Sequence, residues 1–360
     1  MSRVAVVHDW LTGMRGGEKV LEEILAAFPG AELFTLFHFP GSVSPLIESR
    51  TIHTSSLQRL ARRVSDYRKL LPLFPRAARQ WDLGGFDLIV SSSHCVAKGV
   101  DAKGRPHLSY CHTPMRYMWD RFDDYFPWSK PHQRIAAAAL RPWLQRWDVR
   151  TNAGVTRFLA NSAFVAGRIR RYYGRDAEVV HPFVDEAFLA PPLNHARDDA
   201  HLIVSALVPY KKIELAVDAA NAAGKRLDVI GGGPLLETLS RRGGTNVRFL
   251  GPVSTDRIIE RLARARSLIL PGIEDFGITP LEAMALGTPV VAHGAGGVLD
   301  TVVDGTTGIF FREPMVDSLR RAMDEVESRE WDRAALRAHA AAFSRQSFRR
   351  RLLGAAEQLL

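Results

Sequence analysis

Two glutamates, Glu274 and Glu282, lie eight positions apart around a segment whose residue types suit ligand binding. Residues 267–270 are apolar and end in a proline-glycine pair, which predicts a short buried strand followed by a turn. Residues 280–286 have helical composition. In an open α/β sheet, ligands bind beyond the carboxyl ends of strands, where Glu274 would lie. The helix that follows would offer free amides and a positive dipole end to an anion such as a phosphate.

Glu282 also has a purely structural interpretation. Thr279, Pro280 and Glu282 match a capping box with proline at the first helical position, in which Glu282 would satisfy a backbone amide. A capping role and a ligand role do not exclude each other. The spacing alone therefore leaves both open.

Glycine-rich turns follow three of the predicted strands. Gly16 and Gly17 come between a strand at 3–8 and a helix that begins near residue 18, and similar loops occur at 231–233 and 293–297. Glycine lets a backbone approach a phosphate closely, although each loop could also be a tight turn that only starts a helix. Three such loops after strands favour a nucleotide site.

A histidine and two lysines also lie at predicted strand ends. Lys211 and Lys212 follow a strand at 202–206 and begin a helix, where the dipole disfavours a cation unless a bound phosphate supplies negative charge. His112 ends a strand at 108–111, where it could reach a ligand held by another domain. Solvated lysines and a histidine hydrogen-bonded within a turn are the alternatives.

Metal chemistry is not favoured by this sequence. The acidic pair Asp123 and Asp124 has no third ligand nearby, and no cluster of histidine, cysteine and carboxylate has transition-metal spacing. The two cysteines, Cys95 and Cys111, are too few for a disulfide framework and are expected to be small buried residues.

The chain carries a net charge of +9, which favours a polyanionic partner. No motif of a nucleic-acid-binding domain is present, so we expect no nucleic acid. Basic residues alternate with apolar ones at 57–80 and again at 141–147. This composition suits a helix on an anionic membrane surface, and a solvated basic face is the alternative. The first residues lack the features of a signal peptide, so we expect a cytoplasmic protein that attaches peripherally to the inner face of the plasma membrane.

The length of 360 residues is sufficient for two packed domains. Strands alternate with helices, interrupted by a proline-containing connector near residues 188–194, and then the alternation restarts. This pattern predicts an α/β protein with parallel sheets. We expect a Rossmann-like domain at 1–185, a second at 186–343, and a C-terminal helix at 344–360 that packs back on the first domain.

The order of these motifs resembles glycosyltransferase family 4, whose members are retaining, nucleotide-sugar-dependent enzymes of the GT-B fold. The resemblance covers nearly the whole chain. It rests on the following residues: Gly16-Gly17, His112, Ala160-Asn161-Ser162, His181-Pro182-Phe183-Val184-Asp185, Pro209-Tyr210-Lys211, Gly232-Gly233-Pro234 and Glu274 with Glu282. Residues 7–11 and 110–116 resemble the bacterial mannosyltransferases that build O-antigen or exopolysaccharide. The resemblance implies two Rossmann-like domains with parallel sheets that face each other across a cleft.

The resemblance also implies roles for individual residues. Glu274 would bind hydroxyls of the donor sugar, Glu282 would bind the ribose, and Lys211 would contact the phosphates. Gly16 and Gly17 would approach the diphosphate from the first domain, and His112 would lie by the reacting carbon. The sugar and the diphosphate would be held by backbone amides of Phe276, Gly277, Ile278 and Thr279.

One position departs from the family pattern. An arginine usually lies five residues before the lysine, and here that residue is Ala206. The diphosphate would lack a bidentate partner. Lys212 or an arginine from elsewhere in the chain is a candidate replacement, and a low affinity for the donor is the alternative.

The resulting hypothesis is a hexosyltransferase that moves mannose from GDP-mannose onto a lipid-diphosphate-linked or polysaccharide glycan. The nucleotide sugar would be a co-substrate, and neither a metal nor another cofactor is expected. The alternatives are an epimerase or phosphorylase on the same fold, or a non-catalytic GT-B partner subunit.

Overall fold

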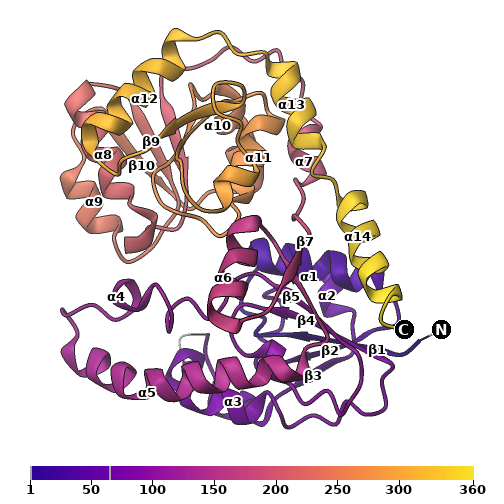
Figure 1. Cartoon of the computed structure of the whole chain (residues 1–360). Helices are drawn as coiled ribbons and strands as arrows, with labels where there is room; N and C mark the ends of the chain where they lie inside the picture. The colour runs from indigo at the N-terminus through magenta and orange to yellow at the C-terminus, as the bar shows by residue number, and fades with distance from the viewer. Residues whose placement is uncertain (1, 65) are drawn as a thin grey trace. The chain divides into compact units, whose positions relative to one another are not determined.

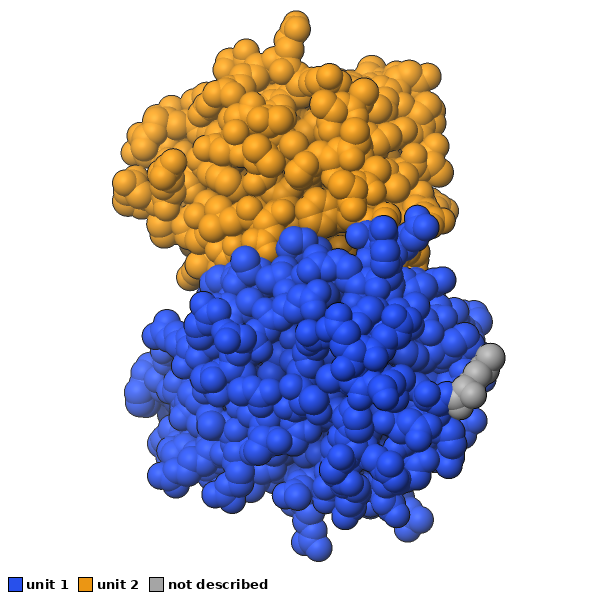
Figure 2. Space-filling model, turned by 45° about the vertical axis from the view of Figure 1, so that its right-hand side comes forward, with its two compact units in different colours: residues 1–181, 346–360 blue, residues 182–345 orange. Residues whose placement is uncertain are grey.

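The computed structural model describes residues 2–64 and 66–360, which form two compact units. Unit 1 comprises residues 1–181 and 346–360, and unit 2 comprises residues 182–345 (Figure 2). These limits differ by a few residues from the expected boundaries after 185 and 343.

Unit 1 contains a seven-stranded sheet in the order β3-β2-β1-β4-β5-β6-β7, in which every neighbouring pair is parallel (Figure 1). The apolar runs that predicted strands are buried in this sheet, as expected for a parallel sheet covered on both faces. Its strands are β1 (Val4–His8), β2 (Glu32–Thr35), β3 (Ile52–Thr54), β4 (Leu88–Ser93), β5 (His107–Cys111), β6 (Arg157–Ala160) and β7 (Ala177–Val179).

Helices cover both faces of this sheet. Neighbouring residues of β5 point to opposite faces. The Tyr110 ring lies 5.5 Å from that of Phe348 on the C-terminal helix, whereas Cys111 belongs to a buried cluster with Val165 and Ile169 of α6. The α-helices that contribute to unit 1 are α1 (Gly16–Ala27), α2 (Pro45–Glu48), α3 (Phe74–Ala77), α4 (Phe122–Tyr125), α5 (Pro131–Arg150), α6 (Ala163–Tyr173) and α14 (Arg345–Glu357).

Unit 2 contains a six-stranded parallel sheet in the order β10-β9-β8-β11-β12-β13. Its strands are β8 (His201–Val204), β9 (Leu227–Ile230), β10 (Val247–Gly251), β11 (Leu268–Leu270), β12 (Val290–His293) and β13 (Gly308–Phe311). Its α-helices are α7 (Glu186–Leu189), α8 (Ile213–Ala223), α9 (Leu236–Arg242), α10 (Thr255–Arg264), α11 (Ile278–Ala285), α12 (Val316–Ser328) and α13 (Arg333–Ala341).

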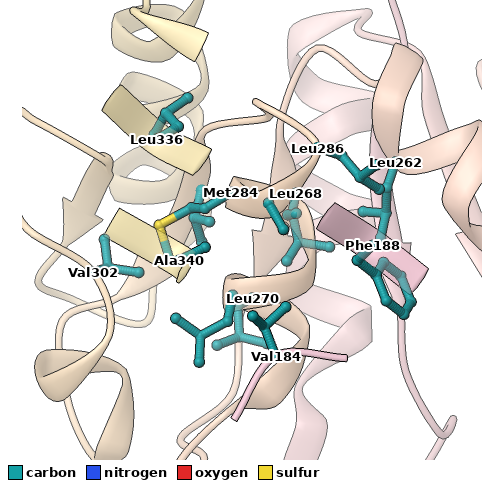
Figure 3. Close-up of a cluster of buried hydrophobic side chains, with 14 of the residues drawn as sticks. Val184, Phe188, Leu262, Leu268, Leu270, Met284, Leu286, Val302, Leu336 and Ala340 are labelled. Atoms are coloured by element: carbon teal, nitrogen blue, oxygen red, sulfur yellow. The ribbon is translucent and has the colours of Figure 1, made fainter. Parts of the chain in front are cut away.

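The core of unit 2 is divided by its sheet into two clusters. Leu268 and Leu270 of β11 contribute to one cluster, together with Met284 of α11 (Figure 3). Ile269, between them in sequence, contributes to the other cluster, together with Val217 of α8. The period of two therefore buries alternate residues of one strand under different helices. Such packing fixes the strand ends, and with them the loops that carry candidate site residues.

The fold prediction of two Rossmann-like domains with parallel sheets is confirmed. The strands predicted at 3–8, 108–111, 202–206 and 267–270 agree with β1, β5, β8 and β11 to within about two residues. Strands β3, β7 and β13 were not predicted. The connector expected near 188–194 begins inside the short helix α7.

Candidate functional site

The candidate residues lie where each sheet reverses its strand order. In unit 1 the order reverses between β1 and β4, and in unit 2 between β8 and β11. Loops that leave such neighbouring strands in opposite directions create a natural binding crevice at their carboxyl ends. Gly16 and Gly17 follow β1, Lys211 follows β8, and Glu274 follows β11.

In unit 2 the structure brings Lys211 and Glu274 together. The Lys211 ammonium donates to Oε1 of Glu274, and both side chains are partly exposed. The two loops can meet because Gly272 has no side chain: a Cβ there would lie 2.7 Å from the Tyr210 carbonyl oxygen and 2.8 Å from Cα of Lys211. The pair forms a site with one cation and one carboxylate at the switch point.

The backbone of Glu274 is held by the loop that follows β12. Its carbonyl oxygen accepts a hydrogen bond of 2.8 Å from the amide of Gly297, and Glu274 forms a parallel bridge with Gly296. Gly296 has a φ of +85°, and a Cβ there would lie 2.6 Å from that same carbonyl oxygen. These glycines allow close backbone packing that positions Glu274.

The glycines of the 231–233 loop also serve backbone packing. A Cβ on Gly231 would lie 1.9 Å from the Ser205 carbonyl oxygen, and one on Gly233 would lie 2.5 Å from the Leu207 carbonyl oxygen. Both glycines have positive φ angles, of +131° and +154°. The loop after β9 is thereby fixed against the loop after β8, which leads to Lys211.

The predicted capping box at Thr279 and Glu282 is wrong. Helix α11 begins at Ile278, and its N-cap is Gly277, with a φ of +87° and no side-chain cap. Thr279 and Pro280 therefore lie within the first turn, where proline costs no hydrogen bond, and Glu282 lies beyond that turn. The capping pattern was misleading because glycine supplied the left-handed conformation two residues earlier.

The start of α11 meets the geometric requirement of an anion site. The amides of Ile278 and Thr279 precede the first hydrogen bond that an α-helix can make internally, so they are open to another acceptor. Phe276, just before the helix, is buried and anchors this turn in the core.

Lys212 is exposed and takes a different position from Lys211. It is the N-cap of α8 with a φ of +55°, one of two non-glycine residues with positive φ among those described. Ala206 is exposed after β8. In the sequence of the unit 2 loops at 205–212, 231–235, 271–277 and 294–296, Lys211 and Lys212 are the only lysines or arginines.

In unit 1 the structure brings Gly17 next to His112. A Cβ on Gly17 would lie 4.0 Å from Cε1 and Nε2 of the His112 ring, so the glycine leaves open space beside the imidazole. Burial lowers the pKa of His112 well below its ordinary value, and the nearby His94, His8 and Arg116 lower it further. His112 is therefore neutral at neutral pH.

Several polar residues around His112 were missed by the sequence analysis. Nε2 of His112 lies 2.8 Å from Oγ of Ser92, and the same oxygen lies 3.1 Å from Nδ1 of the buried His8. Glu18, on the first turn of α1, lies 4.0 Å from Nε2 of His8. Although burial opposes its ionisation, interactions with His8 and His94 lower the pKa of Glu18.

Asp9 organises the loop after β4. Its two carboxylate oxygens accept hydrogen bonds of 2.6–2.9 Å from the amides of His94, Cys95, Val96 and Ala97. Nδ1 of His94 lies 3.1 Å from the same carboxylate, and burial lowers the pKa of His94 against that charge. A polar His8-Asp9 pair that ends an apolar strand was the sequence signal for this arrangement.

Asp123 and Asp124 form ion pairs with Arg134 and Arg121. Among residues 2–64 and 66–360, no group of three or more histidine, cysteine or acidic residues could hold a metal ion. The same residues contain no helix that is both long and apolar enough to span a membrane.

Comparison with known families identifies the class of protein. Residues 14–188 match the model of Glycosyltransferase Family 4, and residues 188–343 match that of Glycosyl transferases group 1. The chain belongs to the family 4 glycosyltransferases with a GT-B fold.

Curated relatives include two kinds of enzyme. A GDP-mannose-dependent alpha-(1-6)-phosphatidylinositol monomannoside mannosyltransferase of Mycolicibacterium smegmatis is 30% identical over 222 residues, which cover 53% of this chain and 56% of the relative. A glycogen synthase of Xanthomonas axonopodis pv. citri is 30% identical over 189 residues, or 49% of this chain and 37% of the relative. The matched segments span about half or less of these relatives' length.

Solved structures share the fold at lower identity. The apo lipopolysaccharide outer core galactosyltransferase WaaB has a TM-score of 0.70 and 16% identity, covering 99% of this chain and all of the other. Anabaena HepE, solved with UDP and glucose, has a TM-score of 0.71 and 18% identity at the same coverage.

Proposed function

We propose that the chain is a retaining hexosyltransferase that uses GDP-mannose and extends a lipid-linked or polysaccharide glycan. The observation that carries this proposal is the contact between Lys211 and Glu274 at the switch point of unit 2, beside the open amides of α11. The 30% identity to a GDP-mannose-dependent enzyme supports the choice of donor.

In the proposed reaction, each group acts on a different part of the donor. Breaking the bond between sugar and phosphate develops negative charge on the departing diphosphate. Lys211 and the amides at 276–279 would stabilise that charge. Glu274 would accept hydrogen bonds from the sugar hydroxyls, and Glu282 would bind the ribose. Gly16 and Gly17 would leave room for the diphosphate, with His112 near the reacting carbon.

The acceptor hydroxyl would attack from the face that the diphosphate leaves, so that configuration is retained. The departing diphosphate itself would take the proton of that hydroxyl. No protein nucleophile is required on this route, and the nucleotide sugar is a co-substrate. If the reaction is metal-independent as proposed, turnover persists after treatment with a chelator.

A glucosyl donor is the second candidate, because a glycogen synthase is also 30% identical over 189 residues and HepE was solved with UDP-glucose. A thermal-shift series with GDP, UDP and ADP separates the two, since a ligand that binds only the folded protein raises its stability. Stabilisation by GDP alone supports the mannosyl donor, and stabilisation by UDP or ADP alone contradicts it.

Turnover is the direct test. The purified chain is incubated with each nucleotide sugar and a lipid-linked glycan acceptor, and both the released nucleotide and the product are analysed. We expect transfer that is lost in Glu274→Ala. An epimerised sugar without acceptor, or a requirement for phosphate, would indicate one of the other GT-B activities, and donor binding without turnover would indicate a non-catalytic subunit.

We also propose that unit 1 attaches to an anionic lipid surface. One side of α5 is exposed and apolar, with basic residues towards its end: Ile135, Ala139, Pro142, Trp143, Arg146, Val149 and Arg150. The only acidic residue of α5, Asp148, is buried against Lys98. Next to Trp143 lies a groove of about 820 Å³ lined by apolar residues such as Leu57 and Leu73, with Arg76 and Arg79. Apolar area flanked by exposed arginines suits anionic lipid.

Vesicle binding tests this attachment. Neutralising Arg59, Arg62, Arg63, Arg68 and Lys69 is expected to reduce binding to phosphatidylglycerol vesicles, whereas neutralising five exposed arginines elsewhere is not. The control set is Arg171, Arg241, Arg257, Arg321 and Arg350. Equal binding by both variants would contradict the proposed surface.

A further inference from the structure

A chain of polar groups in unit 1 runs from the start of α1 to His112. Oε1 of Glu18 lies 4.0 Å from Nε2 of His8, and Nδ1 of His8 lies 3.1 Å from Oγ of Ser92. That oxygen lies 2.8 Å from Nε2 of His112. Glu18, His8 and Ser92 are all buried. Nothing in the proposed reaction uses these three groups directly.

The hydrogen bonds through the Ser92 hydroxyl can have only two directions. A hydroxyl has one hydrogen, so between two imidazole nitrogens it donates to one and accepts from the other. If Ser92 donates to His8, it accepts from a protonated Nε2 of His112. If Ser92 donates to His112, it accepts from a protonated Nδ1 of His8. The direction of the chain therefore decides the tautomer of both histidines.

Glu18 selects between the two directions. Nε2 of His8 is buried without a hydrogen-bond partner among the described residues, and the carboxylate of Glu18 is the acidic group that faces it. A distance of 4.0 Å is too long for a hydrogen bond, but at this distance in a poorly solvated site a full negative charge strongly favours N–H over a lone pair. His8 then carries its proton on Nε2 and accepts from Ser92 at Nδ1.

The outcome at His112 follows from this choice. With Ser92 donating to His8, His112 carries its proton on Nε2, and its Nδ1 is a lone pair. Within residues 2–64 and 66–360, Nδ1 of His112 makes no hydrogen bond and is not fully buried, so it is open to a ligand. The other charged or titratable groups facing the ring are His94, which is paired with Asp9, and Arg116.

We propose that Glu18, His8 and Ser92 are positioning residues that hold His112 in the Nε2–H tautomer, so that its Nδ1 accepts a hydrogen bond from a sugar hydroxyl. The role of His112 at the sugar rests on the proposed function, whereas the tautomer itself does not. The ligand chemistry is specific: the group at this position must donate, as a hydroxyl can and an ether oxygen cannot.

Glu18→Gln is expected to reverse the direction of the hydrogen bonds that link His8, Ser92 and His112. Oε2 of Glu18 accepts a hydrogen bond of 3.1 Å from the Arg15 amide, and this contact would keep the amide oxygen of a glutamine on that side. The NH₂ group of the glutamine would then face Nε2 of His8, and its partial positive charge would favour a lone pair there over an N–H. His8 would carry its proton on Nδ1, Ser92 would donate to His112, and Nδ1 of His112 would become an N–H.

The test is nitrogen NMR of the full chain with ¹⁵N-labelled histidine side chains, in which couplings to the ring protons distinguish the two tautomers. His112→Gln assigns the His112 signals by their disappearance. We expect the Nε2–H form in the parent and the Nδ1–H form in Glu18→Gln. With Ser92→Ala as background, Glu18→Gln should no longer change His112. An Nδ1–H form in the parent, or an unchanged tautomer in Glu18→Gln, would overturn the proposal.

Glu22→Gln is the matched control, because it removes the same charge one turn further along α1, where Glu22 accepts from Ser44. It should leave the His112 tautomer unchanged, and a change there would equally overturn the proposal. In assays of transfer, Glu18→Gln should lower kcat about tenfold, as expected for one hydrogen bond, and leave the Kd of GDP within about twofold. If Glu18→Gln reverses the His112 tautomer but the parent protein transfers no sugar, the roles of Glu18, His8 and Ser92 are supported and the proposed function is rejected.

Discussion

The two units present different chemistry at equivalent places in their sheets. At the switch point of unit 1, the His112 ring is neutral and is held through Ser92 by other buried side chains. At the switch point of unit 2, Lys211 and Glu274 are both partly exposed and form an ion pair. Unit 1 fixes its site through side-chain hydrogen bonds, and unit 2 fixes its site largely through glycine-mediated contacts between loops.

This difference has a physical reason. An imidazole that is largely shielded from solvent stays neutral at little cost, so a hydrogen bond to one of its nitrogens can orient it. A cation that must meet a diphosphate is better left near solvent, because desolvating it without a partner is expensive. Before a ligand binds, the partner of Lys211 is Glu274. Under the proposed function the two units would have different tasks: unit 1 would orient a sugar, and unit 2 would stabilise negative charge.

The largest expected effect separates Lys211 from Lys212 in unit 2. Lys211→Ala should lower kcat/KM by about 10²–10³, the typical loss when one group that stabilises a developing anion is removed. Lys212→Ala, at an exposed residue one position further on, should lower it by less than about tenfold. Steady-state transfer assays measure both. Equal losses would mean that the cation site is diffuse and that the ion pair with Glu274 does not define it.

Two glycine substitutions test whether close packing between loops depends on glycine in unit 2 but not in unit 1. Gly231→Ala should cost about 3 kcal/mol of unfolding free energy, because it places a Cβ against the Ser205 carbonyl oxygen at positive φ. Gly17→Ala should change stability by less than about 0.5 kcal/mol, since its Cβ meets only ordinary contacts in a helix. It should instead slow transfer by filling space beside His112. Denaturant titration measures both stabilities, and a severe loss in Gly17→Ala would remove the contrast.

Restoring the arginine that the family usually has tests whether the candidate site of unit 2 lacks a positive charge. Ala206→Arg should lower the Kd of the nucleoside diphosphate about tenfold, through a bidentate contact with phosphate oxygens. Calorimetry at two salt concentrations measures this gain. Ala206→Gln supplies length without charge as the control. If the glutamine variant tightens binding equally, the gain does not come from charge.

The smallest expected effect concerns an ion pair of unit 2 away from its switch point. The hydrogen bond from His201 lowers the pKa of Glu327 from 4.5 to about 2. Lys225 lowers this pKa further, whereas partial burial raises it. Because the folded-state pKa is the lower one, the stabilisation is fully present above pH 4.5 and is lost as the pH falls towards 2. Glu327→Gln should cost at most about 1 kcal/mol at pH 7, given its exposure to solvent.

This cost should shrink between pH 4.5 and 2 when unfolding midpoints are compared with the parent. Glu325→Gln, at a more exposed glutamate of α12 that pairs with Arg329, should show little pH dependence. A constant difference for Glu327→Gln across that range would mean that its charge does not stabilise unit 2.

Local patterns predicted much of the fold and part of the site. Alternating strands and helices predicted both sheets, because a buried parallel strand is a short apolar run that sequence displays directly. Residue type and strand-end position also singled out Lys211, Glu274, Gly17 and His112. The capping box at Thr279 was wrong because the local rule could not detect that Gly277 would supply the turn.

Other residues could not be predicted from local patterns. Glu18 looked like an ordinary first-turn acid, and Ser92 looked like part of a serine-rich strand. Their roles depend on which strands are neighbours, since the register of β1 and β4 sets His8 opposite Ser92.

The sequence by itself determined the fold class, the glycine-rich loops that follow strands and the residue types that could bind a nucleotide, because periodicity and turn chemistry are local properties. Only the tertiary structure decided that Lys211 meets Glu274, that three loops need glycine for packing, and that Glu18 faces His8. These are contacts between residues 10 to 63 positions apart, whose distances depend on how the strands are ordered.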